Sequence, residues 1–172
     1  MSTVVAWLVP VVNWLQATQL SHFIKQESYW VWPTLETLHF LGMSLLLGAI
    51  GLFDLRVLGL AKSIPPEALH KLVPFGVAGF LLNVATGALF IVGNPDQYAY
   101  NAAFHWKVSF MILAGINLVL FYSTAYGRLR TVPAGGDAPL PAKIMTGVSL
   151  FSWVSVLVCG RLLTWFRPVF FG

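Results

Sequence analysis

The chain has 172 residues, of which 58% are hydrophobic and only 9% are charged, whereas soluble domains carry about 25% charged residues. This composition excludes an ordinary water-soluble globule and a disordered chain, and the single cysteine, Cys159, excludes a disulfide scaffold. The net charge of +4 comes from ten Lys and Arg residues scattered singly along apolar segments, so there is no basic stripe for a nucleic acid. We therefore expect an all-α integral membrane protein that lies in the lipid bilayer. We do not expect it to bind a nucleic acid.

Residues 1–29 form an N-terminal segment that differs from the rest of the chain. Residues 4–20 are apolar, but three polar residues interrupt them and Pro10 would kink a helix. The segment lacks the basic region and cleavage site of a signal peptide, so we expect it to remain in the mature protein. The pattern predicts an interfacial helix over about residues 11–26, with a fifth membrane span as the alternative.

Four later segments are long and apolar enough to cross a bilayer, which requires about 20 mostly apolar residues. Breaks rich in Pro and Gly separate them. The segments are residues 30–53, 73–92, 102–126 and 143–166. Asp54 and Arg56 follow the first of them and are expected to end it. We expect residues 30–172 to form a four-helix transmembrane bundle with up-down-up-down order.

The distribution of Lys and Arg predicts the orientation, because these residues are retained on the cytoplasmic side. Those that follow the first and third spans are Arg56, Lys62, Lys71, Arg128, Arg130 and Lys143. The four that fall on the other side are Lys25, Lys107, Arg161 and Arg167. We therefore expect a multi-pass protein of the bacterial inner membrane with both termini in the periplasm.

Two histidines stand out, because an ionisable residue inside hydrocarbon costs at least a few kcal/mol and is a functional candidate. His39 lies roughly 13 Å along the first span at 1.5 Å per residue, and His105 lies nearer the outer end of the third. The first and third helices run in the same direction and are diagonal in such a bundle, so both histidines can face its axis. Their separation suits a flat macrocycle better than a compact ion, whose ligands lie about 2 Å away. The sequence predicts one haem b with His39 and His105 as axial ligands.

Small and basic residues complete the predicted haem site. The small residues that could make room for the ring are Gly42, Gly87, Ala88 and Gly160. Lys107 and Arg161 are candidates to pair with the haem propionates. The alternatives are close helix packing for the glycines and extension to the lipid headgroups for the two basic residues.

Other interpretations of the histidines remain open at this stage. His39 has Glu36 one helical turn earlier and could bond to it without a cofactor. His39 and His105 could also form a structural polar pair, or a metal or proton site, and Met43 and Met111 could join them at a copper site. A cofactor-free structural subunit of a larger membrane complex is the main rival function.

One polar residue per span lies near mid-depth: Ser44, Asn83, Asn117 and Ser152. We expect hydrogen bonds between helices at this level, with a quinone or ion site as the alternative. We expect His22 and His70 to be solvated, and Cys159 to be a small packing residue.

Catalytic signatures are absent from the sequence. There is no nucleophile elbow, no phosphate-binding Gly-rich loop, and no HExxH or CxxC motif. The sequence also lacks the inverted repeat that is typical of many transporters. We expect a non-catalytic electron-transfer or anchoring subunit of a complex, which serves a periplasmic or membrane redox protein and takes its redox chemistry from the cofactor.

The run LHFLGMSLLLGAIGLFDLRVLGL, residues 38–60, resembles the signature of a group of small four-span bacterial membrane proteins of uncharacterised function. In that group a Leu-His pair opens an apolar, glycine-spaced helix that Asp-Leu-Arg closes. The run is also loosely similar to the opening helix of copper-resistance D-type membrane proteins and of b561-like cytochromes. The first resemblance implies location and topology, and the b561-like one implies a haem-ligand role for His39. This chain lacks the second in-membrane histidine pair of those cytochromes, so we expect one haem.

Overall fold

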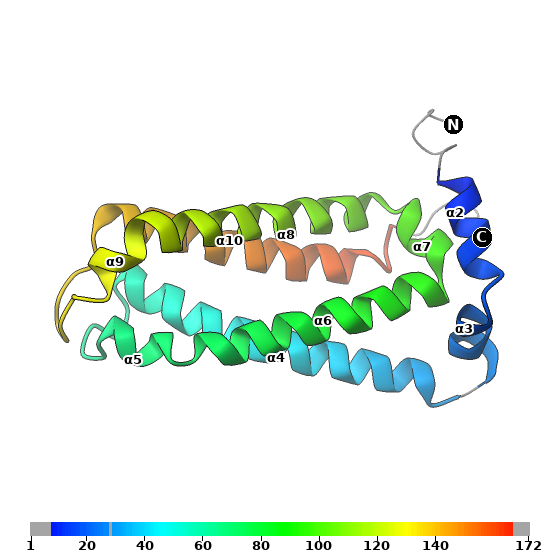
Figure 1. The fold of residues 1–172 in the computed structure, drawn as a ribbon, viewed down its shortest axis with the longest axis horizontal. Helices are drawn as coiled ribbons and strands as arrows, with labels where there is room; N and C mark the ends of the chain where they lie inside the picture. The colour runs from blue at the N-terminus through cyan, green and yellow to red at the C-terminus, as the bar shows by residue number, and fades with distance from the viewer. Residues whose placement is uncertain (1–7, 28, 167–172) are drawn as a thin grey trace.

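A computed structural model describes residues 8–27 and 29–166 of the chain, and in this part every regular element is a helix. The four long helices are α4 (Val31–Leu58), α6 (Val73–Gly93), α8 (Ala102–Leu120) and α10 (Leu140–Leu162), which run side by side in Figure 1. Each belongs to a segment that is long and apolar enough to cross a membrane. The prediction of an all-α chain with four such helices is confirmed, and Arg167 lies outside the described residues.

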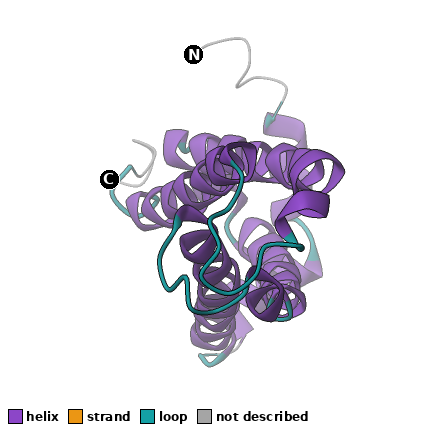
Figure 2. Cartoon of the chain, turned by 90° about the vertical axis from the view of Figure 1, so that its left-hand side faces the viewer, coloured by secondary structure: helices purple, strands orange, loops and turns teal. Residues whose placement is uncertain are grey.

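The helices form two antiparallel hairpins, α4 with α6 and α8 with α10 (Figures 1 and 2). Helix α4 also packs against α10, whereas α6 and α8 make little contact with each other. The order around the bundle is therefore α6, α4, α10, α8, and α4 and α8 are diagonal as predicted. We call the weakly packed side between α6 and α8 the α6–α8 seam.

The first long helix continues beyond its predicted end. The two charged residues expected to close it, Asp54 and Arg56, lie inside α4 and are buried. The helix ends instead before Gly59, whose φ of 116° lies in the left-handed region that glycine adopts without strain. The two charged residues are buried within the helix, so the backbone break at Gly59, rather than the charges, sets the end of the helix.

The third and fourth long helices also differ slightly from their predicted ranges. Helix α8 continues through the π-helical turn η2 (Phe121–Ala125) into α9 (Tyr126–Leu129). Helix α10 starts at Leu140, with Pro residues in its first turn where their missing N–H costs nothing. Helix α6 agrees with its prediction, because Pro74 near its start and Asn94 after its end are clear boundary signals.

The closest approach between α4 and α6 is made by two glycines. A Cβ atom on Gly79 would lie 2.5 Å from the carbonyl oxygen of Gly42, and one on Gly42 would lie 2.9 Å from the carbonyl oxygen of Gly79. Gly42 therefore serves close helix packing, which was the alternative to making room for a haem ring.

Replacing Gly79 by Ala should lower the stability of the folded protein by about 1–3 kcal/mol, because the added methyl group has rigid backbone in its way. The measurement is unfolding of the purified protein in detergent. Gly48→Ala is the matched control, since a Cβ there meets nothing within 4 Å. Equal stability of the two variants would contradict this packing account.

The N-terminal segment folds over one end of the bundle. It forms α2 (Val9–Gln16), α3 (Gln19–His22) and the π-helical turn η1 (Phe23–Glu27), so the prediction of one helix over residues 11–26 was wrong. The break falls at Thr18, whose Oγ1 accepts a hydrogen bond of 3.2 Å from the Ser21 backbone N–H and caps α3. Gln16 donates a hydrogen bond to Asp96 in α7 (Pro95–Ala99), at the right of Figure 1. No fifth span-length helix lies in residues 8–27.

At the opposite end, the buried Arg56 side chain ties two loops together. Its guanidinium donates hydrogen bonds to the carbonyl oxygens of Ile64 and Lys62, in the loop that precedes α5 (Pro66–His70), and of Gly136, in the loop before α10. The bonds to Lys62 and Gly136 measure 3.2 and 3.3 Å. One side chain therefore joins the loop after its own helix to a residue that lies 80 positions after Arg56 in the sequence.

Ion pairs join the same two loops at the surface. Asp137 lies 3.1 Å from Lys62 Nζ and 2.7 Å from Lys143 Nζ. Hydrogen bonds from Lys143 and then Lys62 lower the pKa of the Asp137 carboxyl from its ordinary 3.8 to about 2. The carboxylate is therefore ionised throughout the physiological pH range.

Candidate functional site

His39 projects from α4 towards α6 and is half-buried. Its Nδ1 lies 2.7 Å from the Oγ1 of Thr86, and the Thr86 hydroxyl itself donates a 2.7 Å hydrogen bond to the Leu82 carbonyl oxygen. Because that hydroxyl proton is already used, Oγ1 must accept from His39. The hydrogen-bond network thus assigns the proton to Nδ1 and leaves the Nε2 lone pair free.

The surroundings of the His39 ring are aromatic on one side and open on another. The Phe90 ring lies edge-on with its centroid 5.4 Å away. A Cβ on Gly87 would be only 3.8 Å from His39 Cε1, so this glycine keeps the space beside the ring clear. Glu36 does not bond to His39, since its carboxylate accepts a 3.0 Å hydrogen bond from Trp32 Nε1.

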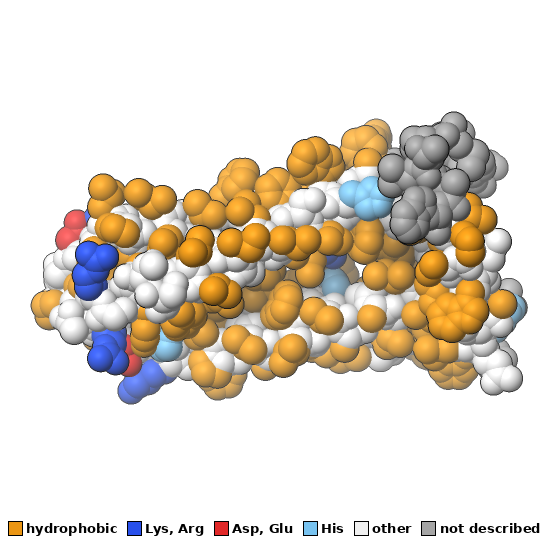
Figure 3. Space-filling view, turned by 45° about the horizontal axis from the view of Figure 1, so that its top comes forward, with side chains coloured by type: hydrophobic (Ala, Val, Ile, Leu, Met, Phe, Trp, Pro, Cys, Tyr) orange, Lys and Arg blue, Asp and Glu red, His pale blue; other side chains and the backbone are white. Residues whose placement is uncertain are grey.

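Lys107 enters the same interior from the diagonal helix α8. It is half-buried. A Cβ on Gly160 of α10 would lie 3.8 Å from Lys107 Nζ, so this glycine leaves room for the ammonium. Both ion pairs among the described residues involve Asp137, and Lys107 has no carboxylate partner there. Figure 3 shows a histidine and a basic side chain recessed between the two hairpins.

Three other residues of the predicted site are exposed in the structure. His105 and Arg161 are exposed on α8 and α10, and Ala88 is exposed on α6. Arg161 forms no ion pair within residues 8–27 and 29–166. The structure therefore brings together His39, Lys107 and their neighbouring glycines, but not His105 or Arg161.

The residues around His39 fit a haem group in their chemistry. A ligating histidine characteristically donates its second ring N–H to a fixed acceptor, and Thr86 is such an acceptor. The Lys107 ammonium, which has no carboxylate partner among the described residues, is a suitable partner for a propionate. By contrast, the described part of the chain contains no group of three His, Cys, Asp or Glu residues that could hold a metal ion. Met111, a predicted copper ligand, instead lines a separate cavity near Asp54.

The predicted layer of hydrogen bonds between helices is mostly wrong. Ser44, Asn83 and Ser152 each donate to the carbonyl oxygen four residues earlier in their own helix. Only Asn117 reaches another helix, with a 2.9 Å hydrogen bond from its Nδ2 to the Met145 carbonyl oxygen of α10. In apolar surroundings a short polar side chain can use the backbone of its own helix, so polarity at one depth does not establish contact.

His70 was predicted to be solvated, but it belongs to an aromatic cluster at the α9 end of the bundle. Its Nε2 lies 2.9 Å from the Tyr122 hydroxyl and its Nδ1 lies 3.2 Å from the Tyr126 hydroxyl. Its ring also packs edge-on against Phe53. His22 is exposed, as predicted.

Sequence reasoning missed two polar residues that position the elements. Thr86 orients His39, and its position three residues after Asn83 on the same face of an otherwise apolar helix was an available signal. Asn101 is 1% exposed; its Oδ1 caps α8 and its Nδ2 donates a 3.0 Å hydrogen bond to the Leu163 carbonyl oxygen. An Asn before an apolar run is a standard helix-capping signal.

The fold and site together define a class: a helical bundle with four span-length apolar segments and an interior histidine and lysine. Comparisons with protein-family models, with curated proteins and with solved structures return no match.

Proposed function

We propose that the protein is a multi-pass protein of the bacterial inner membrane with both termini in the periplasm. The four apolar helices support membrane insertion, and so do their outer faces, which carry large exposed hydrophobic residues such as Phe40, Leu81, Val119 and Phe151. Figure 3 shows hydrophobic side chains along the length of the bundle and the basic side chains gathered mainly at the α9 end. That end faces the cytoplasm in the proposed orientation.

Reporter fusions test this orientation. A reporter fused after Pro65 or Gly135 should be active in the cytoplasm, and one fused after Gln97 should be active on the other side, because the first two positions lie in loops of the α9 end. The reverse pattern would place the interior histidine near the cytoplasmic face and contradict a periplasmic partner.

We propose further that the bundle is a b-type cytochrome-like subunit that binds one haem b between its two hairpins. The observation that carries this proposal is the His39 ring, whose Nδ1–H is fixed by Thr86 and whose Nε2 is free to ligate iron. Lys107 would neutralise a propionate, and Gly87 and Gly160 would leave space beside the two side chains. The geometry supports His39 and Lys107. It adds no support for His105 and Arg161, the other predicted site residues, because both are exposed.

In this role the chain's residues hold and bury the cofactor, and the bound haem supplies one-electron redox chemistry. The apolar helices exclude water around the iron, and the Thr86 hydrogen bond prevents the ring from turning. The subunit would pass electrons to, or anchor, a periplasmic or membrane redox protein within a larger complex.

The absorption spectrum of the protein purified from its native membrane tests this function. We expect a reduced-minus-oxidised spectrum typical of a b-type haem. A protein that is folded and free of haem would instead favour a cofactor-free structural subunit.

A further inference from the structure

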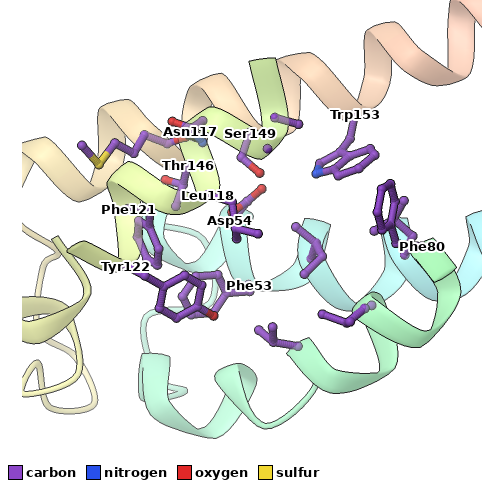
Figure 4. A pocket seen from close by; sticks show the side chains of 18 of the residues that line it. Phe53, Asp54, Phe80, Asn117, Leu118, Phe121, Tyr122, Thr146, Ser149 and Trp153 are labelled. Atoms are coloured by element: carbon purple, nitrogen blue, oxygen red, sulfur yellow. Dashed lines mark hydrogen bonds between the residues drawn. The ribbon is translucent and has the colours of Figure 1, made fainter. Parts of the chain in front are cut away.

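A cavity of about 200 Å³ lies in the half of the bundle nearer α9, away from His39, and all four long helices line it. Its wall is almost entirely apolar. The largest side chains around it include Phe53, Phe80, Leu118, Phe121 and Trp153 (Figure 4). The proposed haem site does not use this cavity.

One carboxyl group, that of Asp54, lies in this apolar wall. Asp54 is only 2% exposed, and its Oδ2 has no hydrogen-bond partner. Ser149 lies beside the same carboxyl group (Figure 4). A buried carboxylate is strongly unfavourable unless a cation or several donors compensate it, and without them the carboxyl group takes up a proton.

The described part of the chain supplies no cation to Asp54. No Lys or Arg lines the cavity, and no ion pair to Asp54 occurs among the described residues. Arg56 is two residues away on the same helix, but its guanidinium donates to the loop carbonyl oxygens of Lys62 and Gly136. The cavity therefore has room for a cationic partner of Asp54 that the described residues do not provide.

The cavity lies along the α6–α8 seam, where the two hairpins make little contact. The lining residues Val77 on α6 and Gly115 and Leu118 on α8 are exposed. In a bilayer this side faces lipid, so a hydrophobic molecule can enter without crossing water.

We propose that this cavity binds a lipophilic amine, a hydrophobic molecule with one protonated amino group. The apolar body fills the space between Phe80, Leu118 and Trp153, and the ammonium donates a hydrogen bond to Asp54 Oδ2. Hydrogen bonds between charged groups are the strong ones, and here the bond also compensates the buried carboxylate.

The test compares binding of n-octylamine and n-octanol to the full-length protein in detergent micelles, followed by tryptophan fluorescence. We expect octylamine to bind more tightly than octanol. Asp54→Asn should weaken octylamine binding by at least about tenfold, the loss typical of a hydrogen bond between charged groups, and should leave octanol binding unchanged. Equal affinities of the two compounds for the native protein, or unchanged octylamine binding in the variant, would overturn the proposal.

A second variant keeps the test decisive if Asp54→Asn does not fold. A Cβ on Gly115 meets nothing within 4 Å, and Gly115 lines the cavity, so the larger side chain of Gly115→Leu should block the seam and abolish binding of both compounds. Gly48→Leu is the matched control, because Gly48 is equally open but does not line the cavity. Unchanged octylamine binding in Gly115→Leu would overturn the proposal. The proposal would also be overturned if the protein bound a short-chain benzoquinone in a manner that depends on Asp54 and did not bind octylamine.

Discussion

Replacing Arg56 by Met should lower the free energy of unfolding by about 1.5–3 kcal/mol, because it removes hydrogen bonds from a charged donor to buried carbonyl oxygens. Arg56 is 1% exposed, and its guanidinium is bonded to the backbone of two loops. Methionine fills a similar length but has no donors, so the loop carbonyl oxygens lose their partners. The loops before α5 and before α10 would then separate.

The measurement is chemical or thermal unfolding of the purified protein in detergent. Arg128→Met is the control. Arg128 is exposed on α9, and its replacement removes the same charge from the same end of the bundle. Arg56→Lys should fall between the native protein and Arg56→Met, since lysine retains the charge but lacks the planar fork of donors. Equal destabilisation by Arg56→Met and Arg128→Met would show that net charge, rather than the loop contacts, matters.

Replacing His39 by Ala should abolish haem binding, because no other described residue at the proposed site presents a histidine nitrogen to the interior. Thr86→Val should act through His39: it removes the hydrogen-bond acceptor, retains similar volume, and should weaken haem binding by about 10–100-fold. Haem content per chain and the reduced spectrum are the readouts. His22→Ala is the control, since His22 is exposed on α3.

The His105→Ala variant separates two forms of the haem site. Loss of the low-spin spectrum would establish His105 as the second axial ligand predicted from the sequence. An unchanged spectrum would agree with its exposed position on α8. Full haem binding by His39→Ala would contradict both forms.

The four long helices were predictable because each requires a long apolar run bounded by Pro, Gly or Asn, and α6 follows that rule at both ends. The end of α4 was not, because Arg56 is buried by loop carbonyl oxygens from as far away as Gly136. The residues next to Arg56 in the sequence do not indicate such a distant partner.

The place of His39 within a long apolar helix was predictable from the sequence, but the exposure of His105 was not. A helix that is apolar on every side gives little indication of which face is turned inward. The hydrogen bond from His39 to Thr86 depends on how closely α4 approaches α6, which Gly42 and Gly79 determine. The weak packing between α6 and α8 at the seam likewise depends on contacts between helices, which the pattern of a single helix does not show.

The most direct test of the central claim is a titration of the purified, haem-free protein with haem b, followed by absorbance, with the native chain and His39→Ala measured in parallel. The account predicts that the native protein saturates at one haem per chain and that His39→Ala shows no saturable binding. Saturable binding of equal affinity in both proteins, or none in the native protein, would contradict it.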